Sequence, residues 1–388
     1  MILIALLSLW TVAKADDAGQ NPDVTYNFIE MCVHHGYLVE VHNVTTADGY
    51  ILTLYRIPGK AGEAKTSNKP VAFLQHGLID LSDTWIMNIP SPGFMMADDG
   101  FDVWFGNSRG SYHSLGHVKY NPWKDALYWN FTWQDMAEFD IPAVIPYVLK
   151  ATGKEKLTYI GHSQGTLQMF AHLSENPDFM KHISLFVALA PVGTVRRISV
   201  ELLQLFDDLP LFHTLELFGI NCFLPNIHEP SLFYDVCSKL SLVCKSGVYI
   251  FADMEVAADN LARMPVILSH EPGGTSMQNM RHWQQMVGYS EYKVQKFDFG
   301  AKKNEKIYGT RDAPQYDFTK IPGPIALFFG TDDRLADSID GNWLRDTIPA
   351  SSVVYTDIIQ NFGHLTFLWG KDMSYFDGVM KMAKDYAV

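Results

Sequence analysis

The chain has 388 residues, of which 47% are hydrophobic and 19% are charged. This is the composition of a globular protein with a large core, and it excludes an intrinsically disordered chain. The formal net charge of −13 would repel nucleic-acid phosphates, and the sequence contains no basic stripe that could offset the repulsion, so we expect no nucleic acid among its partners.

The N-terminus begins with an apolar stretch, residues 2–12, followed by Ala-Lys-Ala at residues 13–15. The stretch is shorter than the ~20 residues of a transmembrane helix, and the two alanines suit a cleavage site. We therefore expect residues 1–15 to be a secretory signal peptide, which implies a secreted or lysosomal protein. Because no positive charge follows Met1, a buried N-terminal helix is the alternative.

Export gives meaning to two N-glycosylation sequons. Asn43 begins an Asn-Val-Thr sequon, and Asn130 begins an Asn-Phe-Thr sequon. Such short patterns also recur by chance, so modification requires that their loops be exposed. We expect glycans at both asparagines.

The four cysteines are Cys32, Cys222, Cys237 and Cys244, too few for a disulfide framework in a chain of this length. Three pairings are possible. The short spacing between Cys237 and Cys244 favours a local disulfide in an oxidising compartment. Cys32 and Cys222 are then either free or joined to each other.

The first element that the sequence predicts is a hairpin between Val41 and Ile57. Its turn is Thr-Ala-Asp-Gly at residues 46–49, and residues 50–55 alternate as a strand does. A polar loop follows from Gly59 to Lys69. Four short apolar runs, separated by helical stretches, come next at residues 71–74, 101–105, 157–160 and 183–189. This alternation predicts a mostly parallel sheet with helices on both faces.

The alternation stops near Val195. Leu, Phe and Met then recur with helical spacing and no clear strand until strand signals return at 324–329 and 352–355. We interpret the interruption as an inserted, mainly helical cap; within it, Lys302–Lys306 is expected to be a solvated loop. The predicted division is a signal peptide (1–15), a first core segment (16–194), a cap (195–315) and a second core segment (316–388).

A serine motif occurs where a predicted strand meets a predicted helix. Residues 161–165 (Gly-His-Ser-Gln-Gly) follow the apolar run 157–160 and precede a helix-like run at 167–173. A strand that turns sharply into a helix strains the residue at the turn, and glycines two positions away make room for it. This context predicts a nucleophile at Ser163, although the bare pattern would also fit a tight turn with a surface serine.

A serine nucleophile needs a base, and the base needs an acid partner. In α/β hydrolases these groups follow the serine in the order acid, then histidine, each after a strand. His364 is the predicted base, because it is the only histidine C-terminal to the acidic loop that follows Phe329. Asp332, Asp333 and Asp337 in that loop compete for the acid role, and spacing alone does not choose between them. Asp337 is better suited to the first turn of a following helix.

The oxyanion of an acyl-transfer reaction needs backbone N–H donors. One donor is expected from Gln164, the residue after the nucleophile, and the other from the loop after the first core strand. Gln75–Leu78 occupies that position, so we expect the Leu78 amide to be the second donor. A simple strand-ending turn is the alternative reading of Gln75–Leu78.

Histidines elsewhere in the chain do not form a recognisable metal site. The pair His34-His35, together with His113 and His117, lacks a Cys or carboxylate arrangement that would complete one. We expect neither a metal nor an organic cofactor. Arg109 lies in Asn-Ser-Arg-Gly, a segment expected to shape a loop beside the pocket, with Arg109 paired to an internal carboxylate.

Four segments carry a wider likeness: Leu74–Leu78, Asp102–Gly110, Gly161–Thr166 and Gly274–Trp283. In this order they resemble the acid lipases, the family of gastric and lysosomal acid lipases, from about Asn21 to the last predicted helix. The resemblance implies an α/β-hydrolase fold, hydrolysis of lipid carboxylic esters, and a cap and lid over the site. It also implies that Asp333 is the acid, because it aligns with the first Asp of the family pattern Gly-Gly-x-Asp-x-Leu-Ala-Asp.

The sequence departs from the family pattern at several positions. Thr331 replaces the second glycine, Asp332 adds a charge, and Thr366 occupies the place of an Asp after His-Leu. The spacing of Cys237 and Cys244 is tighter than that of the family's disulfide. None of these departures removes a predicted catalytic residue.

The sequence therefore predicts a secreted or lysosomal serine lipase that cleaves triacylglycerols or steryl esters through an acyl-enzyme. Its expected partners are the lipid ester and, through the cap, the surface of a lipid droplet or membrane. An acyltransferase on the same fold is one alternative. The other is a non-catalytic lipid-binding or storage protein, which would be expected to have lost members of the catalytic triad.

Overall fold

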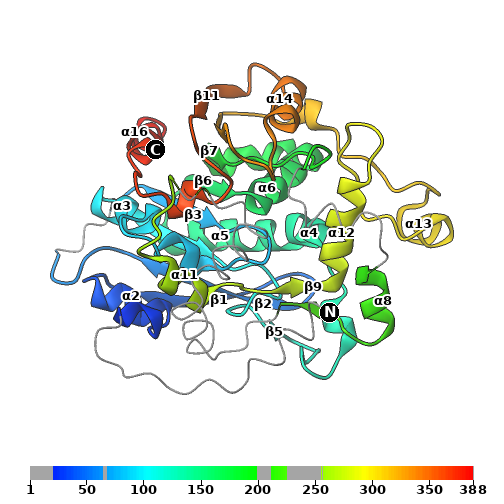
Figure 1. Ribbon diagram of the computed structural model, residues 1–388, viewed down its shortest axis with the longest axis horizontal. Coiled ribbons are helices and arrows are strands. Elements are labelled where there is room, and N and C mark those ends of the chain that lie inside the picture. The colour runs from blue at the N-terminus through cyan, green and yellow to red at the C-terminus, as the bar shows by residue number, and fades with distance from the viewer. Residues whose placement is uncertain (1–20, 64–67, 199–210, 225–254, 256, 388) are drawn as a thin grey trace.

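The computed structural model describes residues 21–63, 68–198, 211–224, 255 and 257–387 (Figure 1). The predicted signal peptide and the predicted Cys237–Cys244 disulfide lie outside these residues. Among the described helices, none combines the length and the hydropathy that crossing a bilayer requires.

The structure places strands where the sequence predicts them and adds short ones. The strands are β1 (Glu40–Thr45), β2 (Tyr50–Ile57), β3 (Val71–Gln75), β4 (Asp102–Gly106), β5 (Gly116–His117), β6 (Leu157–His162), β7 (Ile183–Leu189), β8 (Cys222–Phe223), β9 (Thr275–Ser276), β10 (Ile325–Gly330) and β11 (Val353–Ile359). The predicted hairpin is the antiparallel pair β1–β2, in which Glu40 faces Arg56 and Thr45 faces Ile51.

The main sheet has the strand order β1-β2-β4-β3-β6-β7-β10-β11, with β5 paired to β2. Every neighbouring pair from β4 to β11 is parallel, whereas the pairs that involve β2 are antiparallel. The expectation of a mostly parallel sheet is therefore confirmed.

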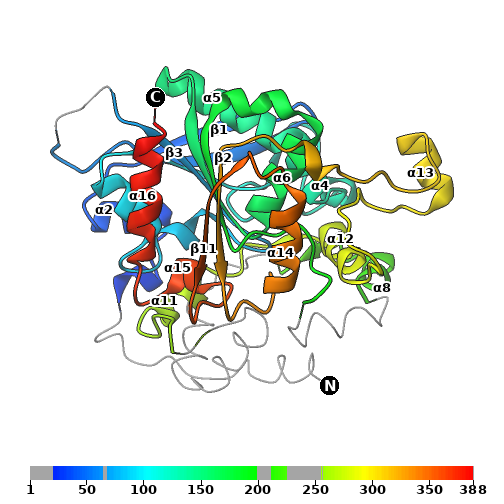
Figure 2. The ribbon, with the colours of Figure 1, turned by 90° about the horizontal axis from the view of Figure 1, so that it is seen from above.

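The described α-helices are α2 (Phe28–His34), α3 (Pro92–Asp98), α4 (Trp133–Asp135), α5 (Ile141–Thr152), α6 (Gln164–Glu175), α8 (Leu211–Leu217), α11 (Met264–His270), α12 (Met277–Val287), α13 (Ala301–Tyr308), α14 (Ser338–Thr347), α15 (Thr366–Trp369) and α16 (Tyr375–Asp385). A π-helical turn, η4 (Met136–Asp140), leads into α5. Short 3₁₀ turns are η1 (Pro22–Val24), η2 (Ser82–Trp85), η3 (Ala126–Trp129), η5 (Pro177–His182) and η6 (Phe318–Lys320). In Figure 2, α3 and α16 lie on one side of the sheet and α6 and α14 lie on the other.

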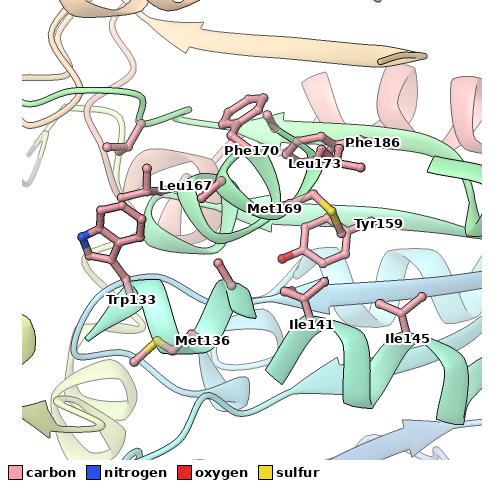
Figure 3. Packing of buried hydrophobic residues seen from close by; sticks show 14 of the residues in the cluster. Trp133, Met136, Ile141, Ile145, Tyr159, Leu167, Met169, Phe170, Leu173 and Phe186 are labelled. Atoms are coloured by element: carbon pink, nitrogen blue, oxygen red, sulfur yellow. The ribbon is translucent and has the colours of Figure 1, made fainter. Parts of the chain in front are cut away.

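Each face of the sheet has its own hydrophobic core, because alternate residues of a strand point to opposite faces. In β10, Ile325, Leu327 and Phe329 join the core under α5 and α6, whereas Ala326 and Phe328 join the core under α3 and α16. Figure 3 shows part of the first core, built from Ile141, Ile145, Tyr159, Leu167, Met169, Phe170, Leu173 and Phe186. A sheet buried on both faces holds its strand ends in fixed positions.

The structure departs from the sequence patterns of the predicted cap in two places. The first is a pair of short strands added to the mainly helical prediction, because β8 pairs with β9 in an antiparallel ladder in which Cys222 faces Ser276. A ladder of two residues on each side is too short to leave a periodic pattern.

The second is the solvated loop at Lys302–Lys306, which belongs to helix α13. Its lysines are exposed, but Asn304 is buried. Asn304 accepts a hydrogen bond of 2.9 Å from the Phe299 amide and donates to Asp298 at 2.7 Å. These bonds hold the first turn of α13, whose exposed face is as rich in charged residues as a solvated loop.

Candidate active site

Ser163 lies between the end of β6 and the start of α6 in a strained conformation, with φ 53° and ψ −120°. Glycine is required on either side by close backbone contacts. A Cβ at Gly161 would lie 2.9 Å from the Gly165 carbonyl carbon, and a Cβ at Gly165 would lie 2.5 Å from the Gln75 carbonyl oxygen. The turn therefore fixes Ser163 at the carboxyl end of the central strands, at the N-terminus of α6.

The structure brings Ser163, His364 and Asp333 into one hydrogen-bonded chain. His364 Nε2 lies 2.7 Å from Ser163 Oγ, and His364 Nδ1 lies 2.9 Å from Asp333 Oδ2. Asp333 follows β10 and His364 follows β11, and both side chains are buried. The Leu335 and Ala336 amides donate to Asp333 Oδ1 at 3.0 and 2.6 Å, so the carboxylate is held in place from its other side.

The other two aspartates of the loop have different contacts. Asp332 Oδ1 accepts a hydrogen bond of 2.9 Å from Thr331 Oγ1. Asp337 is the N-cap of α14 and accepts a hydrogen bond of 2.8 Å from the Ile339 amide. The helix-terminal position expected for Asp337 is thus confirmed, and Asp333 is the aspartate in contact with His364.

Thr366 takes over a backbone contact in the His364 loop. Its Oγ1 accepts a hydrogen bond of 3.1 Å from the Gly363 amide, and the side chain is fully buried. A hydroxyl in this place satisfies the amide next to His364 without adding a charge. The threonine at position 366, where the family pattern has Asp, therefore still forms the hydrogen bond that spans the His364 loop.

The loop after β3 lies directly against Ser163. A Cβ at Gly77 would lie 3.1 Å from Ser163 Cβ and 3.5 Å from its Oγ. Ser108 donates its amide to His76 Nε2 at 3.0 Å, so His76 carries its proton on Nδ1, which donates to the Gly77 carbonyl oxygen at 2.9 Å. Burial lowers the pKa of His76, which keeps this neutral form. In the part of the chain that the structure describes, the Leu78 and Gln164 amides donate to no protein acceptor.

A contact that the sequence did not predict fixes Gln164. Its side-chain Oε1 accepts hydrogen bonds from Asn279 Nδ2 at 2.9 Å and from Trp283 Nε1 at 2.7 Å. Asn279 Oδ1 in turn accepts the Trp133 amide at 2.7 Å. The Gly274–Trp283 segment was notable only for its family likeness, and its buried polar residues were the available signal of this role.

His162 contacts the backbone of the loop that carries His364. Its Nε2 lies 2.9 Å from the His364 carbonyl oxygen. Burial, followed by the neighbouring His364, lowers the pKa of His162 to about 3. The ring is therefore neutral at ordinary pH and donates from Nε2 to the backbone of the predicted base.

Arg109 has the internal partners that the sequence predicts. It is 1% exposed and pairs with Asp140 at 2.7 Å and with Asp48 at 2.5 Å, while its guanidinium stacks 4.1 Å from the centre of the Tyr50 ring. Ser108, the residue before it, accepts hydrogen bonds from Gln75 at 3.0 Å and from Gln168 at 3.3 Å. The loop thus joins β3, α6 and the β1–β2 turn beside the site.

Three of the other histidines singled out in the sequence have hydrogen-bonding partners in the protein. His35 pairs with Asp23, His113 pairs with Asp83, and His117 Nδ1 accepts the Lys119 and Tyr120 amides. Within the described ranges, no group of His, Cys, Asp and Glu side chains has an arrangement that could hold a metal.

Both predicted glycosylation sites and two of the four cysteines lie among the described residues. Asn43 and Asn130 are both exposed. Cys32 is buried and free, and Cys222 is half-buried and free. Of the alternatives for Cys32 and Cys222, the structure has the two free thiols.

A strained serine at a strand–helix turn, joined through histidine to a carboxylate at one edge of a mostly parallel sheet, defines the α/β hydrolases. A family model for the partial α/β-hydrolase lipase region matches residues 28–89, and one for the α/β-hydrolase fold matches residues 70–210. The solved structure of DcsB in complex with its substrate analogue has the same fold, with a TM-score of 0.52, 12% identity and coverage of 90% of this chain and 99% of that one.

Curated relatives match over nearly the whole length. Gastric triacylglycerol lipase of Bos taurus is 39% identical over 376 residues, which cover 94% of this chain and 93% of that protein. Lipase lipl-1 of Caenorhabditis elegans is 38% identical over 382 residues, which cover 95% and 93%. The chain therefore belongs to the acid lipase family of the α/β hydrolases, and it is a carboxylic ester hydrolase.

Proposed function

We propose that this lipase hydrolyses triacylglycerols through an acyl-enzyme on Ser163. Ser163 Oγ attacks the ester carbonyl while His364 removes its proton, and Asp333 orients and stabilises the resulting imidazolium. His364 then protonates the leaving alcohol and activates the water that releases the fatty acid. The observation that carries this proposal is the 2.7 Å contact between His364 Nε2 and Ser163 Oγ.

The Leu78 and Gln164 amides are the proposed donors to the oxyanion. Gly77 packs on Ser163, which supports a position for the next amide of that loop near the reacting carbon. Gln164 begins α6, whose N-terminal dipole favours the developing negative charge. Each donor of this kind contributes ~10²–10³ in kcat.

The experiment for this proposal compares the wild type with Ser163→Ala. The variant is expected to lose ester turnover and covalent labelling by an organophosphonate while it keeps its fold. Ser351→Ala, which changes an exposed serine, is the matched control. Undiminished labelling of the Ser163→Ala variant would overturn the assignment of the nucleophile.

Substrate class is tested with the same wild-type protein. The gastric relatives act, by name, on triacylglycerols, and steryl esters complete the panel. Product analysis with an added acceptor alcohol separates hydrolysis from acyl transfer, since a transferase would yield the new ester. A purified protein inert towards short and long acyl esters from about pH 4 to 8 would favour the lipid-binding alternative.

The proposed partner surface is that of a lipid droplet or membrane, reached through the cap. Leu217 and Phe218 at the end of α8 expose 74% and 80% of their surface. Glu216 of the same helix pairs with Arg281 of α12 at 2.6 Å, which attaches α8 to the cap. Replacing Leu217 and Phe218 with serine is expected to lower activity on emulsified triacylglycerol and to spare activity on a soluble ester.

We also propose export to the extracellular space or a lysosomal lumen, with removal of residues 1–15 and glycans on Asn43 and Asn130. The apolar N-terminus and the exposure of both asparagines support this. Protein isolated from a secreting cell should begin at Asp16 and lose mass on deglycosylation. An intact N-terminus would contradict the signal peptide.

A further inference from the structure

Two carboxyl groups, those of Asp80 and Glu271, interact at the loop that follows β3. Glu271, the C-cap residue of α11, interacts with the side chain of Asp80 through a hydrogen bond, and its other carboxyl oxygen, Oε1, is buried without a hydrogen-bond partner in the described part of the chain. Asp80 Oδ2 accepts the Gly77 amide at 3.3 Å, and Asp80 Oδ1 accepts the Leu81 amide at 2.7 Å. Two carboxyl groups form a hydrogen bond only when one of them is protonated. Because both Asp80 oxygens accept N–H groups, the proton belongs on Glu271.

The surroundings favour this proton. Burial, followed by the charge of Asp80 and the hydrogen bond to it, raises the pKa of Glu271 well above its usual value. The C-terminus of α11 adds a partial negative charge beside the carboxyl group.

Among the described residues, Asp83 also acts on Glu271, and His76 lies near Asp80, whereas His113 and His270 contact Asp83. Although burial opposes it, contacts with His113 and His270 lower the pKa of Asp83, so Asp83 stays negative and adds to the repulsion that Glu271 would meet as an anion. Asp83 in turn raises the pKa of His270, against the effect of burial. His76 is neutral, so this ring does not compensate a second negative charge at the pair.

The loop that Asp80 holds is strained. Ile79 has φ 55°, a left-handed conformation that a β-branched residue rarely adopts. Such a conformation persists only where its surroundings impose it. The Gly273 amide donates to the Ile79 carbonyl oxygen at 2.6 Å, and a Cβ at Gly273 would lie 2.5 Å from the Asp80 carbonyl oxygen. The segment that begins at Glu271 therefore clamps this loop by backbone as well as side chain.

The same loop carries a proposed oxyanion donor. Gly77, whose amide Asp80 binds, packs on Ser163, and Leu78 follows it. Loss of the Asp80–Glu271 hydrogen bond would free the strained turn at Ile79 to relax. Relaxation there would move the Leu78 amide away from the oxyanion.

We propose that protonated Glu271 is a positioning residue, which holds the Asp80 turn and thereby the Leu78 amide, and that its ionisation sets the upper pH limit of ester hydrolysis. The proposal rests on the function proposed above for Ser163 and Leu78. Protonated Glu271 donates one hydrogen bond to Asp80. When the proton leaves to solvent, two anions face each other and the clamp opens.

The experiment measures kcat/KM for a soluble short-chain ester across pH in the wild type, Glu271→Gln and Glu138→Gln. The side-chain amide that Glu271→Gln introduces donates to Asp80 at every pH, so the alkaline limb of the profile should move up by about one pH unit or more, with the acid limb unchanged. Glu138→Gln, which changes an exposed carboxyl in η4, should retain the wild-type profile. An alkaline limb that stays in place in Glu271→Gln would overturn the proposal.

A second variant guards against loss of the fold in the first. Asp80→Asn removes the partner charge but also one acceptor for the Gly77 and Leu81 amides. It should move the alkaline limb in the same direction while lowering the rate at acid pH. Organophosphonate labelling of wild-type Ser163 is measured alongside; without labelling the proposed function itself fails, whereas labelling with an unmoved limb in both variants rejects only the role of Glu271.

Discussion

The side-chain carbonyl of Gln164 accepts a hydrogen bond of 2.9 Å from Asn279, a residue 115 positions further along the chain. Gln164 directly follows Ser163, and its amide is a proposed oxyanion donor. The bond therefore connects helix α12 of the predicted cap to the group proposed to stabilise the transition state. A second bond from Trp283 reaches the same oxygen at 2.7 Å.

Trp283→Phe tests the function of this connection, since it removes the indole N–H and keeps most of the ring. A hydrogen bond of this kind contributes ~1 kcal/mol, so kcat should fall about fivefold. KM should stay unchanged, because the oxyanion exists only in the transition state and the intermediates next to it. Trp123→Phe, in which the indole is 63% exposed, is the control. A rise in KM at constant kcat would point to substrate binding instead.

Asp333→Asn should lower kcat by about 10⁴-fold, because an amide cannot stabilise the imidazolium and favours the wrong tautomer of the histidine. The neighbouring Asp332→Asn should leave kcat within about twofold, since Asp332 bonds Thr331 and not His364. Steady-state kinetics on a soluble ester distinguish the two variants. Similar losses in both would reject the assignment of Asp333.

Arg109→Met should lower the free energy of unfolding by about 3–5 kcal/mol at pH 7.5, because it leaves Asp140 and Asp48 without their cation. Burial raises the pKa of Asp140 to about 6 even with Arg109 present. Without Arg109 this carboxyl protonates more readily, so the loss should shrink at pH 5. Urea denaturation at both pH values measures this, with Arg345→Met, which breaks an exposed pair, as control. An equal loss at both pH values would contradict it.

Gly165→Ala and Gly378→Ala should have opposite effects on stability. A Cβ at Gly165 would lie 2.5 Å from the Gln75 carbonyl oxygen, whereas one at Gly378, inside α16, meets nothing within 4 Å. The first substitution should therefore lower both stability and kcat. The second should raise the free energy of unfolding by about 0.5–1 kcal/mol, as alanine does in a helix interior. Thermal unfolding checks both, and an active Gly165→Ala enzyme would refute the required close approach.

The Asp80–Glu271 pair also predicts a pH dependence of stability. A carboxyl whose pKa is higher in the folded protein binds its proton more tightly there than in the unfolded chain. This contribution to the unfolding free energy is complete below the ordinary Glu pKa of 4.5 and is lost as pH rises towards the raised value. The slope is at most ~1.4 kcal/mol per pH unit. Denaturation at several pH values should show Glu271→Gln gaining stability relative to the wild type as pH rises, and parallel curves would contradict the raised pKa.

Much of the fold could be predicted from the sequence because its signals are local. The strand before Ser163 is an apolar run, and the glycines at 161 and 165 mark a tight turn whose close backbone contacts exclude side chains. Local spacing could not choose between Asp332 and Asp333. The choice depends on how the β10 loop meets the β11 loop across the sheet.

Longer-range polar contacts could not be predicted in this way. Asn279 and Asp80 are ordinary polar residues in the sequence, and their contacts depend on segments that fold back across more than a hundred residues. Helix α13 was missed for a different reason: its charged run has the composition of a loop, and buried Asn304 is what secures it.

The bonds from α12 to Gln164 limit how substrate can be admitted. If α12 moved away together with the rest of the predicted cap, Asn279 and Trp283 would leave Gln164, and the proposed oxyanion site would be lost and re-formed at each turnover. Admission by a smaller movement leaves α12 in place and the reaction centre assembled throughout. Helix α12 would then belong to the fixed wall of the active site and not to the part that moves when substrate enters.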